Sequence, residues 1–376
     1  MPATIKSALI VGGGFSGMTA AITLSRLGIA VDLVEIDPEW TCYGAGISIG
    51  GATLRALRTL GLLDRFVELG NVCDDVDVRA PNGARLATIP TPRIAGEDVP
   101  GSGGIMRPTL ARILADEVTR SGVRVRTGCT IEHLRETVDE VEVTFSDGST
   151  RSYDLVVGAD GLMSKLRKTL FPEAPAPKYN GQGVWRAVLP RSPKINTTVL
   201  WVSDQTKVGL NPVSRDEMYL FVNENRPEKR RVDERDYLAS LLALLEPFTA
   251  EEIQAVRAQL NGSSRINFRP IENMLMPLPW SKDRVVLIGD AVHATTPHLA
   301  MGAGIGIEDA LVLADEIANC KRVPDALAAF GARRWERCRM VVEDSARLGE
   351  IETQGGDKAE HSMIMRRAFA ALAEAI

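Results

Sequence analysis

The feature that most constrains the fold is a glycine-rich turn near the start of the chain. Residues 7–11 form a largely apolar run of the kind expected for a buried parallel strand. The run leads directly into GGGFSG at residues 12–17, and residues 18–27 then carry apolar side chains at helical spacing. A second apolar strand, residues 30–34, follows and ends at Glu35. This order predicts the first unit of a Rossmann-like sheet.

Three glycines of this turn each have a separate role in holding a nucleotide. Gly12 permits the tight turn, Gly14 lets the backbone approach a pyrophosphate, and Gly17 lets the helix pack closely on the strand. The first helical turn presents free N–H groups and the positive end of the helix dipole to the phosphates. Glu35 lies where a carboxylate accepts hydrogen bonds from the ribose of an adenosine half. The segment therefore predicts a dinucleotide site and leaves FAD and nicotinamide nucleotides both open.

Two further carboxylates follow short apolar strands. Residues 153–159 lead into Asp160, and residues 284–289 lead into Asp290. Open α/β sheets bind ligands at the carboxyl ends of their strands, so both side chains are candidates for the same site. The alternative for each is a helix cap or a turn residue.

The middle of the chain has a different pattern. Short β-rich runs are separated by Pro, Asn, Asp and Ser, which is typical of an antiparallel sheet, and two helical stretches follow. The runs are residues 183–189, 198–202, 207–210 and 218–222, and the helical stretches are residues 234–245 and 250–260. The chain length of 376 residues fits two packed units. We therefore expect an α/β protein with a mainly antiparallel second domain.

Composition and spacing exclude several classes of function. A formal net charge of −5 argues against a nucleic-acid-binding surface. Charged residues interrupt every apolar run, so no membrane span and no signal peptide are expected. The five cysteines form no CxxC pair, which favours free thiols in a reducing cytoplasm. His293 and His298 do not have the i, i+4 spacing that stacks two ligands on one helix face, so no metal site is expected.

One short segment matches a motif of a different enzyme class. Residues 46–50, GISIG, fit the GxSxG pattern of the nucleophile in α/β-hydrolases, and a helical pattern follows. Residues 40–44 do not form a convincing strand, and no Asp or His partner follows in a comparable setting. We therefore do not expect a hydrolase.

Three motifs in one order identify a family that the chain resembles. They are GGGFSG, VVGADGLMSKLR at residues 156–167, and RVVLIGDAVHATTPHLAMGAGIGIEDA at residues 284–310. Over about residues 5–345 the chain resembles the single-component FAD-dependent monooxygenases of the aromatic-hydroxylase type, which include salicylate, hydroxybenzoate and urate hydroxylases. The resemblance implies a Rossmann-like FAD-binding domain with a mainly antiparallel β-sheet substrate domain. The implied parts are residues 1–72, 103–178 and 266–345 (FAD), 73–102 and 179–265 (substrate), and 346–376 (a C-terminal helical segment).

The resemblance also assigns residues to each part of FAD. The set comprises Gly12, Gly14, Gly17 and Glu35 at the ADP half, Ile131 at adenine, Arg107 and Asp160 at the pyrophosphate, Asp290 at the ribityl hydroxyls, Ala45 and Gly46 beside the ring, and Gly302 and Ala303 at the pyrimidine edge. The last two open a helical stretch, whose positive dipole end would stabilise negative charge on the reduced ring. Two acids later in that stretch, Glu308 and Asp309, are also expected simply as early residues of a helix.

The same resemblance places three side chains at the substrate. Tyr219 would hydrogen-bond a ring hydroxyl, Lys207 would pair with an anionic substrate, and His298 would act as a hydrogen-bond partner or base. The alternatives are a sheet tyrosine, a solvated lysine and a histidine that fixes its loop. Met301 stands where the family usually has Gln, so a polar group near the flavin or substrate is missing.

The implied function is hydroxylation of a small aromatic or heteroaromatic, anionic substrate. FAD, NADH or NADPH, and O2 would act through a flavin hydroperoxide in an enclosed site. The alternative is a flavin-dependent reductase or dehydrogenase on the same fold that does not oxygenate. A flavin halogenase is not expected, because no second tryptophan-rich motif is present. We expect a cytoplasmic monomer or homodimer. The role of the Trp185-Arg186 pair does not follow from the sequence.

Overall fold

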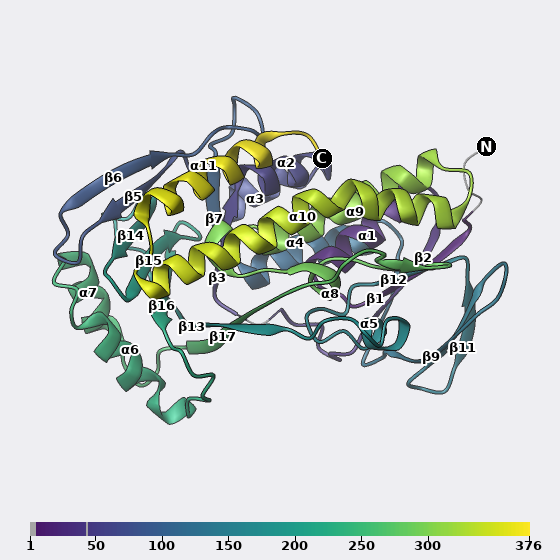
Figure 1. Ribbon diagram of the computed structural model, residues 1–376, viewed down its shortest axis with the longest axis horizontal. Coiled ribbons are helices and arrows are strands. Elements are labelled where there is room, and N and C mark those ends of the chain that lie inside the picture. The colour runs from purple at the N-terminus through teal and green to yellow at the C-terminus, as the bar shows by residue number, and fades with distance from the viewer. Residues whose placement is uncertain (1–4, 43) are drawn as a thin grey trace.

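The computed structural model describes residues 5–42 and 44–376 and shows an elongated molecule with two β-sheet parts toward opposite ends (Figure 1). The first part contains a six-stranded sheet with the order β18-β19-β12-β1-β2-β8. Its strands are Ser281–Lys282 (β18), Val285–Leu287 (β19), Leu155–Gly158 (β12), Ser7–Val11 (β1), Ala30–Glu35 (β2) and Arg124–Thr127 (β8). All neighbours are parallel except β18 and β19. The apolar run before the glycine turn is therefore an interior strand, as predicted.

Helices and a small sheet enclose this parallel sheet. The helix after the glycine turn, α1 (Phe15–Arg26), packs against both α4 (Arg107–Arg120) and α9 (Gly302–Asn319). A three-stranded antiparallel sheet of β9 (Ile131–Glu136), β10 (Val141–Phe145) and β11 (Thr150–Tyr153) lies beside β1. The arrangement confirms the Rossmann-like part of the predicted fold.

The second part is a seven-stranded sheet with the order β17-β13-β16-β15-β14-β5-β6. Its strands are Ile266–Leu275 (β17), Lys178–Pro190 (β13), Glu217–Asn225 (β16), Thr206–Pro212 (β15), Thr198–Val202 (β14), Asp75–Arg79 (β5) and Arg85–Pro90 (β6). Only β14 and β5 are parallel neighbours. Residues 266–345 were expected in the FAD-binding part. The first ten of them form β17, which pairs with β13 in the seven-stranded sheet.

One face of the seven-stranded sheet has its own hydrophobic core. Trp185 and Trp201 are fully buried there, together with Phe248 from the segment between two helices. The helical cover consists of η1 (Glu234–Asp236), α6 (Tyr237–Leu245) and α7 (Glu251–Gln259). The other face is turned toward a small sheet of β3 (Gly46–Gly50), β7 (Ser102–Met106) and β4 (Asn71–Cys73), because β15 contacts β7 and β16 contacts β3. The helices α2 (Gly51–Thr59) and α3 (Leu63–Leu69) follow β3.

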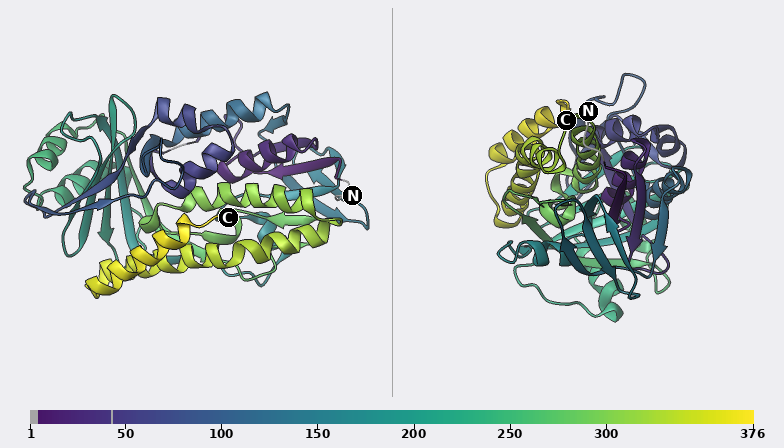
Figure 2. Two further views of the ribbon diagram at one scale, coloured as in Figure 1. Left: turned by 90° about the horizontal axis from the view of Figure 1, so that it is seen from above. Right: turned by 90° about the vertical axis from the view of Figure 1, so that its right-hand side faces the viewer.

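A long C-terminal helix connects the two parts. α10 (Val323–Gln354) runs lengthwise along the molecule and contacts α9, β17 and β13 (Figures 1 and 2). It passes without a break through the expected boundary at residues 345 and 346, and α11 (Lys358–Ala373) then turns back toward α2. Arg55 of α2 donates hydrogen bonds to three carbonyls at the end of α11, those of residues 372–374. The short elements α5 (Lys165–Leu170), α8 (Asp290–His293) and η2 (Pro297–Leu299) complete the fold.

The cysteines, the helices and Ser48 bear on three further expectations. All five cysteines have free thiols. Among the described residues, no helix combines the length and apolar character that a bilayer crossing requires. Ser48 of the GxSxG match lies inside β3 rather than at a strand-to-helix turn, and its hydroxyl accepts a hydrogen bond from Asn211 at 2.9 Å. That position lacks the geometry of a hydrolase nucleophile.

Candidate active site

The glycine turn has the shape that a nucleotide phosphate requires. A Cβ on Gly12, whose φ is +105°, would lie 2.4 Å from the carbonyl oxygen of Ala159, and a Cβ on Gly17 would lie 1.9 Å from that of Gly12. A Cβ on Gly14, by contrast, would meet nothing within 4 Å. Gly14 is the N-cap of α1, and no side chain caps the helix. The backbone N–H groups at this end are therefore available to an anionic ligand, as the FAD expectation requires.

Glu35 contributes to the turn as well as facing the expected ribose position. Its carboxylate accepts hydrogen bonds from the backbone N–H of Gly13 at 2.7 Å and of Asp37 at 2.9 Å. The indole of Trp40 donates to the carbonyl oxygen of Gly13 at 2.9 Å, so an aromatic side chain closes over the turn. Sequence reasoning missed Trp40, whose only signal was an aromatic residue shortly after the acidic strand end. The predicted ribose contact of Glu35 remains a prediction.

The segment predicted to contact adenine lies next to Glu35. Cys129 donates its backbone N–H to the carbonyl oxygen of Glu35 at 2.9 Å, and Ile131 begins β9 two residues later. Both residues are therefore at the carboxyl edge of β2 and β8, where the ADP half is expected. The adenine contact of Ile131 stays a prediction.

Asp160 caps a helix with one carboxylate oxygen and leaves the other oxygen without a partner among the described residues. One carboxylate oxygen accepts hydrogen bonds from the backbone N–H groups of Lys165 at 2.8 Å and Leu166 at 3.2 Å, which caps α5. The other oxygen is buried and has no hydrogen-bond partner within the described chain. An unpartnered carboxylate oxygen beside the glycine turn is consistent with a ligand contact and leaves the predicted cofactor role open.

Asp160 and Asp290 are linked by an arginine that sequence reasoning did not single out. The guanidinium of Arg167 is buried and donates to the carbonyl oxygens of Leu162 and Ala291, each at 2.7 Å. It thereby ties the loop after Asp160 to the helix that begins with Asp290. The only sequence signal was its place at the end of VVGADGLMSKLR.

Asp290 is exposed at the start of α8, while the protein around it still limits its hydration. Desolvation raises the pKa of this carboxyl, and the positive charge of Arg107 together with His293 opposes the rise. Because the side chain is exposed, solvent screening reduces the effect. The ribityl contact of Asp290 stays a prediction.

Arg107 and the loop of Ala45 and Gly46 are neighbours. The backbone N–H of Arg107 donates to the carbonyl oxygen of Ala45 at 3.1 Å, and the guanidinium carbon lies 5.2 Å from the ring centre of Phe15. Phe15 is the first residue of α1, so Arg107 sits at the uncapped helix end. This brings the predicted pyrophosphate arginine to the predicted phosphate loop.

The start of α9 resembles that of α1. Gly302 is its first residue, Met301 is the N-cap, and no side chain caps the helix. Its first backbone N–H groups, including those of Gly302 and Ala303, therefore remain available to a ligand, and their contact with the flavin edge stays a prediction. Met301 itself is buried, and its sulfur accepts a hydrogen bond from Thr53 at 3.8 Å. The residue in place of the usual Gln thus packs into the core against α2.

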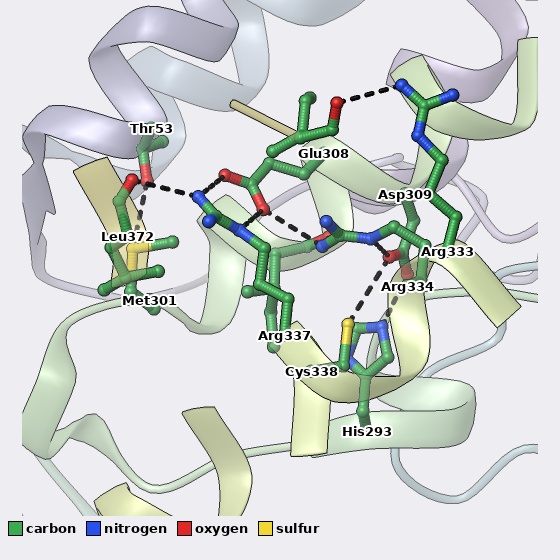
Figure 3. A network of polar contacts seen from close by, with 12 residues as sticks. Thr53, His293, Met301, Glu308, Asp309, Arg333, Arg334, Arg337, Cys338 and Leu372 are labelled. Carbon is green, nitrogen blue, oxygen red and sulfur yellow. Dashed lines mark hydrogen bonds and ion pairs between the residues drawn. The ribbon is translucent and has the colours of Figure 1, made fainter. Parts of the chain in front are cut away.

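A buried network of charges supports the residues around Asp290 (Figure 3). Asp309 accepts hydrogen bonds from the backbone N–H of Gly289 at 2.9 Å, from His293 at 2.5 Å and from Arg334 at 2.8 Å. Glu308 pairs with Arg334 at 3.0 Å and with Arg337. Both acids are completely buried, so they do more than the ordinary acids of a first helical turn. Burial alone would raise the pKa of Asp309, but His293 and Arg334 hold it below its usual value.

The same network bears on metal binding. His293, Asp309 and Cys338 each bring one potential ligand atom to one place. Both oxygens of Asp309 already accept hydrogen bonds, and the Arg334 guanidinium at 2.8 Å would repel a cation. The cluster has the chemistry of a structural ion-pair network.

The three predicted substrate side chains do not gather at one point. Lys207 pairs with Glu352 of α10 at 2.6 Å, and the Nε2 of His298 lies 3.3 Å from the other oxygen of the same carboxylate. Thr296 hydrogen-bonds the other ring nitrogen of His298 at 2.8 Å. Tyr219 lies apart from this group, and its hydroxyl accepts from Arg186 at 3.0 Å. An anionic substrate would therefore have to compete with Glu352 for Lys207.

Glu352 was also missed by sequence reasoning. Burial alone would raise its pKa, but Lys207 and His298 hold the pKa well below the usual value. Burial lowers the pKa of His298, and the nearby Glu352 opposes that change. Glu352 therefore stays ionised and joins the end of α10 to β15 and η2.

We predict that two alanine substitutions in the turn affect different properties, one the stability of the protein and the other its affinity for FAD. Gly17→Ala places a methyl group against the Gly12 carbonyl and should lower the free energy of unfolding by about 1–3 kcal/mol. Gly14→Ala meets no protein atom and should keep the stability but weaken FAD binding. Thermal unfolding of the apoprotein and FAD titration by fluorescence separate the two effects. Equal FAD affinity in Gly14→Ala and the wild type would contradict the assigned phosphate path.

Asp309→Asn should lower the free energy of unfolding by about 3–5 kcal/mol, because it leaves Arg334 and two other donors without their charged acceptor. The matched control is Asp315→Asn on the same helix, whose ion pair with Arg333 is exposed and should be worth less than about 1 kcal/mol. Urea denaturation measures both. A small loss for Asp309→Asn would show that the network is not a structural requirement.

Glu352→Gln should destabilise the protein at neutral pH by about 1–3 kcal/mol, since it leaves Lys207 unpaired. The folded-state pKa of Glu352 is depressed, so its contribution is present above the ordinary value of 4.5 and is lost as the pH falls below it. The difference in melting temperature from the wild type should therefore shrink below that pH. Glu350→Gln, on the exposed side of α10, is the control. A pH-independent difference would be inconsistent with this account.

Comparisons with known proteins agree with this geometry. A family model described as "FAD binding domain" matches residues 6–345. The chain is 31% identical to aurachin C monooxygenase/isomerase of Stigmatella aurantiaca, covering 91% of this chain and 88% of the relative. It is 30% identical to 6-hydroxynicotinate 3-monooxygenase of Bordetella bronchiseptica, covering 90% and 91%.

A solved structure matches nearly the whole fold. Klebsiella pneumoniae HpxO complexed with FAD and uric acid superimposes with a TM-score of 0.83, at 25% identity, over 98% of this chain and 93% of that one. The family match spans the glycine turn, both strand-end aspartates and the start of α9. The chain therefore belongs to the FAD-binding domain family, and it is a flavin-dependent monooxygenase of the aromatic-hydroxylase type.

Proposed function

We propose that this enzyme hydroxylates a small, anionic aromatic or heteroaromatic compound, with NADH or NADPH as reductant and O2 as oxidant. One oxygen atom of O2 enters a ring C–H bond, the other leaves as water, and the reductant supplies the two electrons. Bound FAD would carry those electrons and activate O2. The residues of the chain bind the cofactor and substrate, orient them and limit access of water.

The contact between Gly46 and Tyr219 is the observation that carries this proposal. A Cβ on Gly46 would lie 2.5 Å from the Cβ of Tyr219, so the predicted flavin-side loop and the seven-stranded sheet touch directly. Ala45, Val213 and Tyr219 form a small apolar cluster there, with Met106, Val188 and Phe221 packed around it. A hydroxyl group and aromatic rings thus lie beside the loop expected to hold the flavin ring. That setting suits a flat ring substrate better than an extended or highly charged one.

The likeness to proteins named for heteroaromatic substrates supports the same substrate class. The relative from Bordetella is named for 6-hydroxynicotinate, and the HpxO structure contains uric acid. Both molecules are small, flat and anionic near neutral pH. We extend only this chemical class to the present enzyme, because Lys207 is already paired with Glu352 and Met301 packs into the core.

We predict that NADH or NADPH oxidation by the FAD-loaded protein is stimulated at least about tenfold by one member of a panel of ring carboxylates and purines. The panel should include 3-hydroxybenzoate, 6-hydroxynicotinate and urate. Oxidation is followed by absorbance, product by mass spectrometry and hydrogen peroxide by a peroxidase assay. Peroxide should account for only a small part of the reductant consumed, because an enclosed site favours oxygen transfer over peroxide release.

Two outcomes would contradict the proposal in different ways. Reductant oxidation with an equal amount of peroxide and no hydroxylated product across the panel would favour a reductase or dehydrogenase that does not oxygenate. Failure of the purified protein to bind FAD would remove the basis of the proposal altogether.

A further inference from the structure

Arg186 lies on the face of the seven-stranded sheet that is turned toward the flavin-side loop. Its neighbours in β13, Trp185 and Ala187, are both fully buried in the core under α6 and α7. Alternate residues of a strand point to opposite faces, so Arg186 points the other way. Its Nε donates to the hydroxyl of Tyr219, which itself packs on Gly46. The arginine is therefore held beside the expected position of the flavin ring.

The positive charge of Arg186 has no counter-ion in the described part of the chain. The side chain is half-buried, and within residues 5–42 and 44–376 its hydrogen-bond partner is the neutral Tyr219. Two other arginines in the strands of this sheet, Arg79 and Arg85, have a carboxylate partner in Asp77. A partly buried guanidinium that faces a binding site without a carboxylate is suited to an anionic ligand.

Tyr219 adds a second donor at the same place. Arg186 can only donate, so the Tyr219 oxygen must be the acceptor of their 3.0 Å hydrogen bond. The hydroxyl proton of Tyr219 is then free to be donated elsewhere. The guanidinium Nη groups and the tyrosine O–H together offer converging donors for the oxygens of one anionic group.

Aromatic side chains provide a flat surface next to these donors. Phe221 is the register partner of Arg186 and also of Gly209 on the next strand. A Cβ on Gly209 would lie 2.0 Å from the Phe221 ring, so the ring lies directly over that glycine. The ring centres of Phe221 and Tyr219 are 5.4 Å apart, with an angle of 35° between the planes. An aromatic ring that bears an anionic group can pack on this surface while the group meets Arg186.

Lys207, the cation first expected to bind the substrate, is already neutralised. Its ammonium lies 2.6 Å from the Glu352 carboxylate, which also faces His298 and His361. A substrate anion that bound Lys207 would have to displace the Glu352 carboxylate. Displacement would separate Glu352 from Lys207 in a largely buried setting, which is unfavourable. Among the described residues of β13 and β17, Arg186 and Arg269 are cations on this face without a carboxylate partner, and Arg186 is the half-buried one that contacts Tyr219.

We propose that Arg186 and Tyr219 bind the carboxylate, or an equivalent ring oxyanion, of the aromatic substrate and thereby select anionic over neutral rings. The inference rests on the proposed function, since it deepens the assignment of the same site. Arg186 is then the main residue that determines specificity for charge, and the Trp185-Arg186 pair has two roles. Trp185 holds the strand in the core, and Arg186 faces the substrate.

The test compares matched carboxylate and carboxamide ligands by calorimetry, without reductant or turnover. The probes are 6-hydroxynicotinate with 6-hydroxynicotinamide and 3-hydroxybenzoate with 3-hydroxybenzamide, titrated into the FAD-loaded protein. The wild type should prefer at least one carboxylate over its amide by about tenfold or more, the usual effect of a charge-assisted hydrogen bond. Arg186→Gln should remove this preference and leave amide binding nearly unchanged, which a loss of general packing would not do.

Matched variants separate this role from the alternatives. Arg269→Gln removes an exposed arginine from the neighbouring strand β17 and should keep the preference. If Arg186→Gln does not retain FAD, Arg186→Lys carries the test. It keeps the charge but not the two-pronged donor, so carboxylate affinity should fall by about threefold or more, with amide affinity unchanged.

Several results would overturn the inference. The first is an unchanged preference for carboxylate over amide in Arg186→Gln, or in Arg186→Lys where that variant carries the test. The second is loss of the preference in Lys207→Gln instead. The third is a wild type that binds no carboxylate better than its amide. Because binding is measured without turnover, the two proposals fail separately. A carboxylate preference without hydroxylated product would reject the hydroxylase but keep the anion site, and hydroxylation without a charge preference would do the reverse.

Discussion

The carboxylate of Asp309 is the interaction on which the cofactor side of the structure depends. It joins residues 289–293 and α10 to its own helix α9, because its donors are Gly289, His293 and Arg334. Gly289 has a φ of +62°, and the chain turns there into α8, so the hydrogen bond to its N–H fixes the direction in which Asp290 leaves the sheet. Arg334 fixes α10 against α9 at the same point. A single buried acid thus orients a predicted ribityl ligand and the uncapped start of α9.

A second carboxylate, Glu352, does the equivalent work at the C-terminal end of α10. Glu352 binds Lys207 of β15 and faces His298 of η2, so the long helix is fixed to the substrate sheet as well as to the cofactor part. The two parts of the fold are therefore held in one relation by ion pairs in the N-terminal half of α10 and at its C-terminal end. This arrangement explains why Lys207 and His298, although near the expected site, are occupied with protein partners. Tyr219 and Arg186 are among the polar groups directed from the sheet toward the flavin-side loop, and neither has a carboxylate partner in the described part of the chain.

The sequence predicted the parts of this structure that depend on local patterns. The strand, glycine turn, helix and second strand of residues 7–35 follow from apolar spacing and from glycines that close contacts require, and the motifs carried the family and cofactor. The partners of Lys207 and His298 could not be predicted in this way. Glu352 is 145 positions from Lys207, in a stretch that appears only polar in sequence. The same is true of Arg167, whose hydrogen bond to Ala291 spans 124 positions. Such pairs are set by packing rather than by local propensity.

The physical difference between Lys207 and Arg186 shows why a family position does not by itself define a ligand contact. Both are cations on one sheet, and the family resemblance of the sequence implied the lysine as the substrate contact. The energetic cost of burying an unpaired charge decides between them. The charge of Lys207 is already balanced by Glu352. An anionic substrate could bind Lys207 only after this ion pair had separated. Arg186 has only a neutral tyrosine, so an anionic ring would supply the missing charge at no such cost.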